Sequence, residues 1–345
     1  MAPIATKQLG KFGPRVPALG FGAMGISTWY GKIDDDETRL RVLDRAYELG
    51  ITFWDTADIY GDSEELLGKW FKRTGKRDEI FLATKFGSLL NAGDYTGFRS
   101  DPEYARECCD RSLKRLGVDY IDLFYCHRLD GKTPIEDTVE AMVGLKRGGK
   151  IKYLGLSEMS AESLRRACAV HHIDAVQMEY SPFALDIEYP EIGILKACRE
   201  LGVAVVCYSP LGRGFMTGRY NSPDDFDPDD LRRIMPRFAP ENFSKNLEVV
   251  AQFKALAQKN GCTPAQLCLA FLMAQGDHII PIPGTRSVKY LEDNAGALNI
   301  ALPPAALTEI RRALEATEVA GARYPEMLKH SCYVDTPPRN SPTKN

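Results

Sequence analysis

The chain has 345 residues, of which 44% are hydrophobic and 26% charged, an ordinary composition for a globular protein. Its formal net charge of -3 gives no electrostatic case for a nucleic-acid partner or for an anionic membrane. The length allows one large α/β barrel or two smaller domains.

Short apolar runs alternate with helical patterns along the chain. The runs are typical of β-strands and lie at residues 17–21, 51–55, 79–85, 121–127, 151–157, 174–180, 203–210 and 277–284. Helical patterns follow nearly all of them, at 34–49, 63–73, 101–116, 134–147, 160–170, 189–201 and 287–298. Continuous apolar runs suit a parallel sheet that is buried on both faces. Eight βα units predict one α/β domain, a (β/α)8 TIM barrel over residues 1–324, with a doubly wound sheet as the alternative.

Two segments interrupt this alternation. Residues 211–260 form a long insertion after the seventh strand pattern, and their acidic sequence NSPDDFDPDD is typical of a functional loop or a solvated surface. Residues 325–345 form a Pro-rich, polar C-terminal tail that we expect to be mobile. Residues 88–100, SLLNAGDYTGFRS, are a candidate lid over a substrate.

Targeting and metal-binding signals are not evident. The first residues contain no apolar core of signal-peptide length, and no run of about 18 apolar residues follows. Nine cysteines lie scattered without paired spacing, which argues against a disulfide framework. Because neither CxxC nor HExxH occurs, we expect no metal, and a reducing cytoplasmic compartment is the simplest expectation.

The sequence LGFGAMGI places Gly20, Gly22 and Gly25 in a literal GxGxxG pattern. In a dinucleotide-binding domain this motif opens directly into a helix whose N-terminus faces the pyrophosphate. Here the helical pattern begins only near Asp34, so the context of a Rossmann domain is missing. The glycines instead indicate a strand end and loop where the backbone approaches a ligand.

Polar side chains stand where the predicted strands end. Asp55 ends the second strand and Tyr60 follows it, while Lys85 ends the third strand and His127 the fourth. In a (β/α)8 barrel the carboxyl ends of the strands converge on the active site. Each residue alone has an ordinary structural explanation, but their joint position predicts one site.

These four residue types together suit proton delivery to a carbonyl oxygen. A free tyrosine has a pKa of about 10, which is too high for efficient proton exchange near neutrality. We expect the Lys85 ammonium to lower the pKa of Tyr60, and Asp55 to keep Lys85 charged. His127 can donate a hydrogen bond to a carbonyl oxygen, whereas Asp58 is expected to form a turn. Such a site needs a hydride source.

Eight short motifs lie near the predicted strand ends, namely LGFGAMG, FWDTADIYG, LATKFG, DLFYCHR, KYLGLSE, VQMEYSP, YSPLGRG and IPGTR. They make the chain resemble the aldo-keto reductases up to about residue 316. The motif order is similar to the branch with pyridoxal reductases, aryl-alcohol dehydrogenase-like enzymes and potassium-channel β subunits. The resemblance implies a catalytic tetrad of Asp55, Tyr60, Lys85 and His127, with Tyr60 as general acid. It also implies NADP(H) bound without a Rossmann domain.

The resemblance further implies a set of NADP(H)-binding residues. Ser157, Glu158 and Gln177 would hold the carboxamide, and Tyr208 would stack on the nicotinamide. The remaining contacts would come from Gly22, Met24, Ser209, Pro210, Leu211, Gly212, Gly214, Arg219, Gly284, Thr285, Arg286, Asp293 and Asn294. Within this list, Arg286 is expected at the 2′-phosphate and favours NADP over NAD. Glu158 and Tyr290 depart from the family pattern, in which Asn and Gln are common there.

The predicted reaction is NADPH-dependent reduction of an aldehyde or ketone to an alcohol. Residues expected to shape the substrate pocket are Trp29, Tyr30, Phe86, Tyr95, Phe98, Arg128 and Tyr180. One alternative is a cofactor-binding redox sensor with slow turnover, like a channel β subunit. Another is a barrel hydrolase that uses Asp55 and Asp58 as paired carboxylates, although their spacing does not make them face each other.

Overall fold

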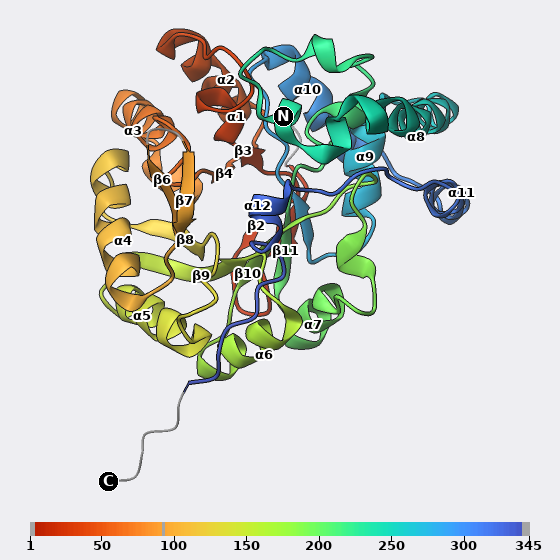
Figure 1. Ribbon diagram of the computed structural model, residues 1–345. Coiled ribbons are helices and arrows are strands. Elements are labelled where there is room, and N and C mark those ends of the chain that lie inside the picture. The colour runs from red at the N-terminus through yellow and green to blue at the C-terminus, as the bar shows by residue number, and fades with distance from the viewer. Residues whose placement is uncertain (1–3, 92–93, 340–345) are drawn as a thin grey trace.

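Eight parallel strands form the centre of the molecule, and helices surround them (Figure 1). The computed structural model describes residues 4–91 and 94–339. The strands are β3 (Phe21–Gly22), β4 (Phe53–Asp55), β5 (Phe81–Phe86), β8 (Ile121–Cys126), β9 (Ile151–Ser157), β10 (Ala175–Glu179), β11 (Ala204–Tyr208) and β12 (Ile279–Pro281). Each strand pairs with its neighbour in chain order, so all eight predicted strands are confirmed.

The first and last strands meet and close the barrel. The Gly20 amide donates to the Pro281 carbonyl at 3.0 Å, and the Gly22 amide donates to the Pro283 carbonyl at 3.2 Å. Neighbouring strands in chain order that return to the first strand define a (β/α)8 barrel. The predicted barrel is therefore confirmed, and the doubly wound alternative is wrong.

Strand side chains alternate between the barrel interior and the helices. Leu123 and Tyr125, two residues apart on β8, lie in the interior cluster, whereas Phe124 lies in the cluster shared with the helices. A hairpin of β1 (Thr6–Gln8) and β2 (Arg15–Pro17) adds Leu9 and Val16 to the interior cluster. The interior is thus a packed core, and the period of two fixes which residues at the strand ends face inward.

Helices follow the strands and cover the outside of the sheet. The barrel helices are α2 (Asp36–Glu48), α3 (Ser63–Thr74), α4 (Pro102–Leu116), α5 (Ile135–Arg147), α6 (Ala161–Val170), α7 (Ile194–Leu201), α9 (Pro264–Met273) and α10 (Val288–Gly296). Local signals set their ends. Asp35 accepts a hydrogen bond from the Thr38 amide at 2.9 Å, and Gly117 ends α4 with a left-handed φ of 64°.

Four further helices and a hairpin lie outside the repeating βα pattern. They are α1 (Met24–Ser27), α8 (Pro240–Lys259), α11 (Pro304–Glu315), α12 (Glu326–Lys329) and the antiparallel pair β6 (Ser88–Asn91) and β7 (Asp94–Phe98). The hairpin occupies the predicted lid segment, whose residues 92 and 93 lie outside the described residues. No helix among residues 4–91 and 94–339 has the length and apolar character needed to cross a membrane.

The insertion after β11 carries its own aromatic core. It contains the 3-10 helices η3 (Phe215–Thr217), η4 (Pro223–Asp225), η5 (Leu231–Ile234) and η6 (Pro236–Phe238), followed by α8. The ring of Phe215 lies 5.5 Å from Phe238 and 5.0 Å from Phe243, between centroids. Phe226 lies 5.8 Å from Phe238. The insertion is therefore a folded part of the barrel rim.

The C-terminal tail lies against the barrel up to residue 339, so the expectation of mobility is wrong for this part. Val334 forms a parallel bridge with Met159 at the end of β9. Arg166 on α6 donates to the carbonyls of Thr336 and Pro337 at 2.7 Å each. These hydrogen bonds hold a segment whose composition alone suggests disorder. Figure 1 shows α12 over the centre of the barrel. Residues 340–345 lie outside the described residues.

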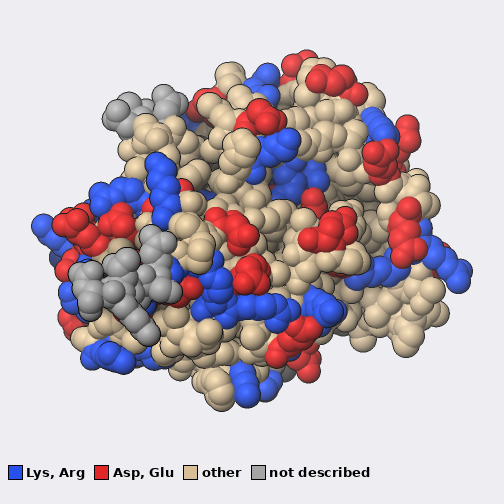
Figure 2. All heavy atoms as spheres, turned by 60° about the horizontal axis from the view of Figure 1, so that its bottom comes forward, with Lys and Arg blue, Asp and Glu red and all other residues tan. Residues whose placement is uncertain are grey.

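The visible surface carries charges of both signs. On the face shown in Figure 2, basic and acidic side chains alternate over short distances, as the small net charge suggests. This face therefore offers no extended basic surface for a nucleic acid.

Two helical glycines allow a test of the barrel packing. A Cβ at Gly68 on α3 would lie 2.8 Å from the carbonyl oxygens of Arg115 and Leu116, whereas a Cβ at Gly144 on α5 would meet nothing within 4 Å. We expect Gly68→Ala to lower the free energy of unfolding by about 1–3 kcal/mol. Gly144→Ala should raise it by about 0.5–1 kcal/mol because alanine favours the helix. Urea unfolding of both variants checks the pair, and stabilisation by both would contradict the close α3–α4 contact.

Candidate active site

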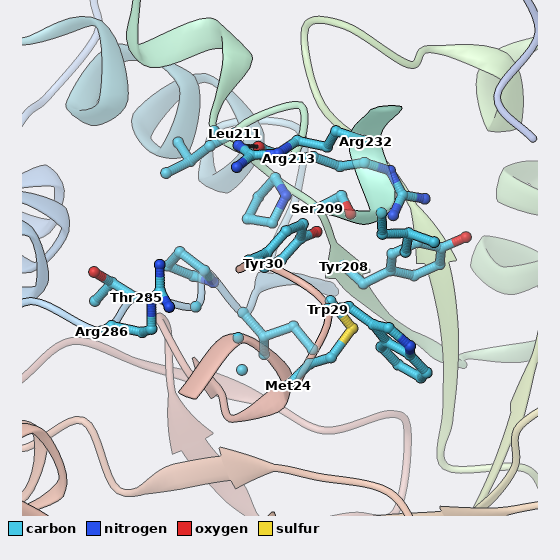
Figure 3. Close-up of a pocket in the computed structure, with 18 of the residues that line it drawn as sticks. Met24, Trp29, Tyr30, Tyr208, Ser209, Leu211, Arg213, Arg232, Thr285 and Arg286 are labelled. Carbon is cyan, nitrogen blue, oxygen red and sulfur yellow. Dashed lines mark hydrogen bonds between the residues drawn. The ribbon is translucent and has the colours of Figure 1, made fainter. Parts of the chain in front are cut away.

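A long cavity opens at the carboxyl ends of the barrel strands. Its volume is about 900 Å³, within the roughly 300–1,000 Å³ typical of ligand sites. Figure 3 shows Thr285 and Arg286 at one end of this cavity and Trp29 and Tyr208 at the other.

The four tetrad residues are brought together at the Trp29 end. The Lys85 Nζ lies 3.3 Å from the Tyr60 hydroxyl, and this hydroxyl lies 3.5 Å from the His127 Nε2. Lys85 also donates to Asp55 Oδ1 and, at 2.7 Å, to the carbonyl oxygen of Thr56. Asp55, Tyr60 and His127 line the cavity, while Lys85 lies fully buried behind the tyrosine.

The alternation of the strands explains why these side chains converge. Phe53 and Ala83 lie in the barrel interior, and Asp55 and Lys85 follow each of them by two residues. His127 follows the interior residue Tyr125 by two in the same way. Residues two apart on a strand share a face, so all three side chains point inward at the top of the barrel.

Tyr60 reaches the site from a loop that is tied to β5. The Thr56 amide donates to the Ala83 carbonyl at 2.8 Å, and the Asp58 amide donates to the Lys85 carbonyl at 3.1 Å. Gly61 follows the tyrosine with a φ of 55°, and a Cβ there would lie 2.7 Å from the Ser27 carbonyl. The loop therefore turns sharply at a position that glycine alone fills without strain.

Burial dominates the protonation of the tetrad. Burial raises the pKa of Tyr60 well above its ordinary value, the Asp55 carboxylate adds to this, and Arg128 opposes it. The expectation of a lowered Tyr60 pKa is thus wrong, because removal of the phenol from water outweighs the nearby cations. Burial also holds the pKa of His127 well below its ordinary value, with the charges of Arg128 and Lys85 adding to the effect. Tyr60 and His127 are therefore both neutral near pH 7.

The buried ion pair beneath the tyrosine is balanced by hydrogen bonds. Burial raises the pKa of Asp55 and lowers that of Lys85, while each partner's charge opposes the shift of the other. The Gln177 amide donates to Asp55 Oδ2 at 2.7 Å, so both carboxylate oxygens are engaged. With Asp55 bound in this way, it is not available as one of two hydrolytic carboxylates.

Asp58 points away from the cavity, so the paired-carboxylate hydrolase is wrong. Its Oδ2 lies 3.3 Å from Arg111, and it does not bond backbone amides as expected of a turn-former. Burial, with the neighbouring Glu64, raises the pKa of Asp58 to about 7. This side chain belongs to the contact between the loop and α4.

Three of the four residues predicted around the nicotinamide ring and its carboxamide line the cavity. Ser157, Gln177 and Tyr208 do so, and the Ser157 hydroxyl donates to the Gln177 carbonyl at 2.9 Å. Glu158 has a left-handed φ of 53° and is fully buried outside the described cavity wall. The turn at Glu158 thus carries its carboxylate to the Tyr208 hydroxyl, and Oε2 of Glu158 has no hydrogen-bond partner among the described residues.

Glu158 instead anchors a buried ionic cluster. Its Oε1 accepts from the Tyr208 hydroxyl and from Arg323, both at 2.8 Å. Arg323 also donates to Glu179 at 3.1 Å. Burial raises the pKa of Glu158, but Arg323 and Arg128 outweigh it, and the net pKa lies below the ordinary value. Arg323 comes from the C-terminal segment, so this segment stabilises the Tyr208 side of the cavity.

The loop after β11 turns through several left-handed residues along the middle of the cavity. The φ angles of Ser209, Gly212, Arg213 and Gly214 are 48°, 55°, 55° and 84°. Ser209, Arg213 and Gly214 line the cavity, and so do Pro210, Leu211 and Arg219, whereas Gly212 does not. The amides of Gly212 and Gly214 donate within the loop, to Ser209 at 2.9 Å and to Leu211 at 3.0 Å, so it is the close backbone approach allowed by glycine that suits contact with a phosphate.

The far end of the cavity is built by β3, β12 and α10. Gly284, Thr285, Arg286, Asp293 and Asn294 line it next to Gly22, whereas Met24 packs beside Tyr60 and Trp29 at the tetrad end. A Cβ at Gly284 would lie 2.5 Å from the Gly22 carbonyl, so the two backbones approach closely at this point. Arg286 donates to the Lys32 carbonyl, and Asp293 accepts from the Thr263 hydroxyl at 3.1 Å. The end therefore offers cations and polar groups to a ligand.

Tyr290 lies at this end of the cavity as well. Its ring is exposed by 43% and lies 5.7 Å from the Arg219 guanidinium. Both residues line the cavity, so the ring forms a flat wall at this end.

Four of the seven predicted pocket residues reach the cavity. Trp29, Tyr30, Tyr95 and Arg128 line it, and the Trp29 ring stacks on Tyr95 at 6.0 Å between centroids. Phe86, Phe98 and Tyr180 do not line the described cavity. Phe86 stacks on Phe124 in the core, the Tyr180 hydroxyl donates to Glu188, and Phe98 lies on β7.

The sequence patterns did not predict several residues that line the cavity. Tyr324 and Leu328 come from the C-terminal segment, and Arg213 comes from the YSPLGRG motif. The motif could have pointed to Arg213, because a cation beside a glycine-rich loop suits an anionic ligand. No pattern singles out Tyr324, which directly precedes the predicted tail and whose hydroxyl lies 3.0 Å from that of Tyr208.

Comparison with known proteins assigns most of the chain to one family. A model described as "Aldo/keto reductase family" matches residues 18–315. The aldo-keto reductase str7 of Strobilurus tenacellus is 54% identical over 330 residues, 94% of this chain and 96% of its own. The aldo-keto reductase yakc [NADP(+)] of Schizosaccharomyces pombe is 52% identical over 339 residues, 97% of this chain and 98% of its own.

Solved structures agree with this assignment. A glycerol dehydrogenase of Gluconobacter oxydans superposes with a TM-score of 0.81 at 27% identity, over 92% of this chain and 97% of its own. A thermostable aldo-keto reductase in complex with the inhibitor epalrestat gives a TM-score of 0.72 at 27% identity, over 90% and 100%.

The ionic cluster behind Tyr208 yields a pH-dependent prediction. Arg323→Gln leaves Glu158 and Glu179 buried without this cation, and we expect a loss of about 3–5 kcal/mol in the free energy of unfolding at about pH 8. In the native protein the pKa of Glu158 is lowered, so its contribution to stability is lost only as the pH falls below the ordinary carboxyl range. In the variant, burial raises the pKa of Glu158. The loss in the free energy of unfolding therefore becomes smaller as Glu158 binds a proton towards about pH 5.

Urea unfolding at both pH values measures this difference. Arg165→Gln is the matched control, because Arg165 pairs with Glu200 on the surface, where such pairs contribute about 0–1 kcal/mol. An Arg323→Gln loss that stays the same at both pH values would contradict the buried cluster.

Proposed function

The chain belongs to the aldo/keto reductase family, and we propose that it reduces an aldehyde or ketone to an alcohol with NADPH, using Tyr60 as general acid. Membership makes it an oxidoreductase of carbonyl compounds, and the relative from Schizosaccharomyces pombe carries the label NADP(+). The observation that carries the assignment to Tyr60 is its hydroxyl, which lies between Lys85 Nζ at 3.3 Å and His127 Nε2 at 3.5 Å.

The residues around the cavity fit an extended dinucleotide. Ser157 and Gln177 would hold the carboxamide, with Tyr208 against the nicotinamide ring. The left-handed turns from Ser209 to Gly214 would receive the pyrophosphate. Arg286 would hold the 2′-phosphate, with Asn294 near the adenine. When bound, NADPH supplies the hydride that reaches the carbonyl carbon.

Tyr60 would deliver the proton that completes the alcohol. Its raised pKa keeps the hydroxyl protonated near neutrality, so it can donate to the carbonyl oxygen. Neutral His127, with a proton on Nε2, would donate a second hydrogen bond to the same oxygen and fix the position of the carbonyl. The phenolate left on Tyr60 would then accept a hydrogen bond from Lys85, whose charge Asp55 maintains.

The role of Tyr60 can be tested by removing one oxygen atom. We expect Tyr60→Phe to lower kcat for benzaldehyde reduction by about 100-fold or more, because general acid catalysis contributes about 10²–10⁴-fold. The dissociation constant of NADPH, measured by fluorescence quenching, should change by less than about twofold. Tyr153→Phe, on β9 outside the described cavity wall, is the control and should retain activity. Reduction by Tyr60→Phe at a rate similar to the native enzyme would show that another group supplies the proton.

The choice of NADP over NAD can be tested at Arg286. We expect Arg286→Ala to raise the dissociation constant of NADPH by about 10- to 100-fold, since hydrogen bonds to charged groups contribute roughly 1.5–3 kcal/mol. NADH lacks the 2′-phosphate and serves as the internal control, with little expected change. Equal losses of affinity for both cofactors would place the 2′-phosphate elsewhere.

A further inference from the structure

Arg128 is a buried cation that forms no ion pair within 4 Å in the part of the chain that the structure describes, and Glu158 acts on it only from a greater distance. Its exposed fraction is 8%, and it follows the tetrad residue His127 directly. Its Nη1 donates to the His127 carbonyl at 2.7 Å and to the Ser157 hydroxyl at 3.1 Å, and its Nη2 to the Tyr324 hydroxyl at 3.5 Å. All three acceptors are neutral, and a buried charge without a counter-charge is costly.

The other buried cations of residues 4–91 and 94–339 each have a carboxylate within 4 Å. Lys85 pairs with Asp55. The four other buried arginines also pair with carboxylates: Arg39 with Asp36 and Asp62, Arg232 with Asp230, Arg237 with Asp186, and Arg323 with Glu158 and Glu179. Arg128 is therefore the exception among the buried cations of the described residues, because it has no carboxylate within 4 Å. Because Arg128 lines the cavity, a ligand in the cavity could supply the missing negative charge.

A second guanidinium adds to the positive charge on the same wall. Arg213 has a side chain exposed by 7%, its Nη2 makes no hydrogen bond, and the Glu179 carboxylate lies 3.7 Å from it. Glu179 is shared with Arg323, so Arg128, Arg213 and Arg323 face only Glu158 and Glu179 within this described cluster. The cluster therefore carries one uncompensated positive charge at the edge of the cavity.

Aromatic rings line the same end of the cavity. Trp29 packs edge-on against Tyr60 at 5.6 Å and stacks on Tyr95, and Tyr324 extends the lining. Flat apolar walls suit an aryl or unsaturated carbon skeleton, while the guanidinium of Arg128 suits a carboxylate. The two features together describe an anionic compound with a planar body.

We propose that the substrate is a carbonyl compound that also carries a carboxylate, such as an aryl or unsaturated oxo-acid, and that Arg128 binds this carboxylate with Arg213 beside it. The inference rests on the proposed carbonyl reductase function and names its substrate class. The carboxylate itself takes no part in the chemistry. The carbonyl carbon receives the hydride and the carbonyl oxygen receives the proton of Tyr60, as described above.

A purely electrostatic role of Arg128 makes a different prediction. The charge of Arg128 opposes the rise that burial causes in the pKa of Tyr60, and this effect would act on every carbonyl substrate alike. Recognition of a carboxylate acts only on substrates that have one. The ratio of kcat/KM for an anionic substrate to that of a neutral one therefore separates the two roles.

The test uses 3- and 4-carboxybenzaldehyde together with their methyl esters. We expect the native enzyme to prefer at least one acid over its ester, although the ester is the more electrophilic aldehyde. Arg128→Gln should lower that ratio by about 10- to 100-fold, in line with the loss of a charge-assisted hydrogen bond. Arg128→Lys should keep part of the preference because it keeps the charge.

The double variant Asp230→Asn/Arg232→Gln is the matched control, since Arg232 lines the same cavity, Asp230 neutralises it at 2.6 Å, and removal of both partners leaves no carboxylate unpaired. It should leave the ratio of acid to ester unchanged. The native enzyme provides a further measurement if Arg128→Gln does not fold, because 4-(hydroxymethyl)benzoate should inhibit it at least about tenfold more strongly than the methyl ester.

Several results would overturn the inference. They are equal activity of the native enzyme on acid and ester, an equal loss on both substrates in Arg128→Gln, and a weaker affinity for NADPH as the sole effect of that variant. Reduction of the esters with NADPH that depends on Tyr60 tests the proposed function separately. If that reduction occurs without any preference for the acids, the substrate class fails while the reductase assignment stands.

Discussion

The ion pair between Lys85 and Asp55 is the interaction on which the site depends. Neither charge would survive alone at the top of a packed barrel, because burial shifts the pKa of each towards its neutral form. The pair persists because Gln177 and the Thr56 carbonyl satisfy the remaining polar atoms. This places a fixed cation 3.3 Å from the Tyr60 hydroxyl without a metal ligand set among the described residues.

A second ionic cluster organises the opposite wall of the cavity. Arg323, from beyond the last barrel helix, lies between Glu158 and Glu179 at the ends of two neighbouring strands. Through Glu158 it fixes the Tyr208 hydroxyl, and the bridge between Val334 and Met159 holds the same segment to β9. The C-terminal segment is thus a structural part of the cavity, because a buried cluster is stable only when all its members are in place.

The sequence was sufficient for the barrel and the tetrad because both follow from local patterns. Apolar runs fixed the strands, and the period of two brings Asp55, Lys85 and His127 to one point. The same period, applied to Phe86 beside Lys85, would have placed that ring in the core. Tyr324 and the role of Arg323 could not be predicted, since their positions depend on contacts between residues more than 100 positions apart.

Under the proposed function, the protonation state of the site near neutral pH is the one that starts a reduction. Burial keeps Tyr60 protonated and His127 neutral, so both can donate to a carbonyl oxygen. Oxidation of an alcohol would first require the phenolate of Tyr60, and the apolar surroundings oppose this anion until the pH rises. Lys85 and Arg128 offset part of this cost once the proton has left. The same burial that raises the pKa of Tyr60 therefore sets the protonation state in which the free enzyme meets its substrate.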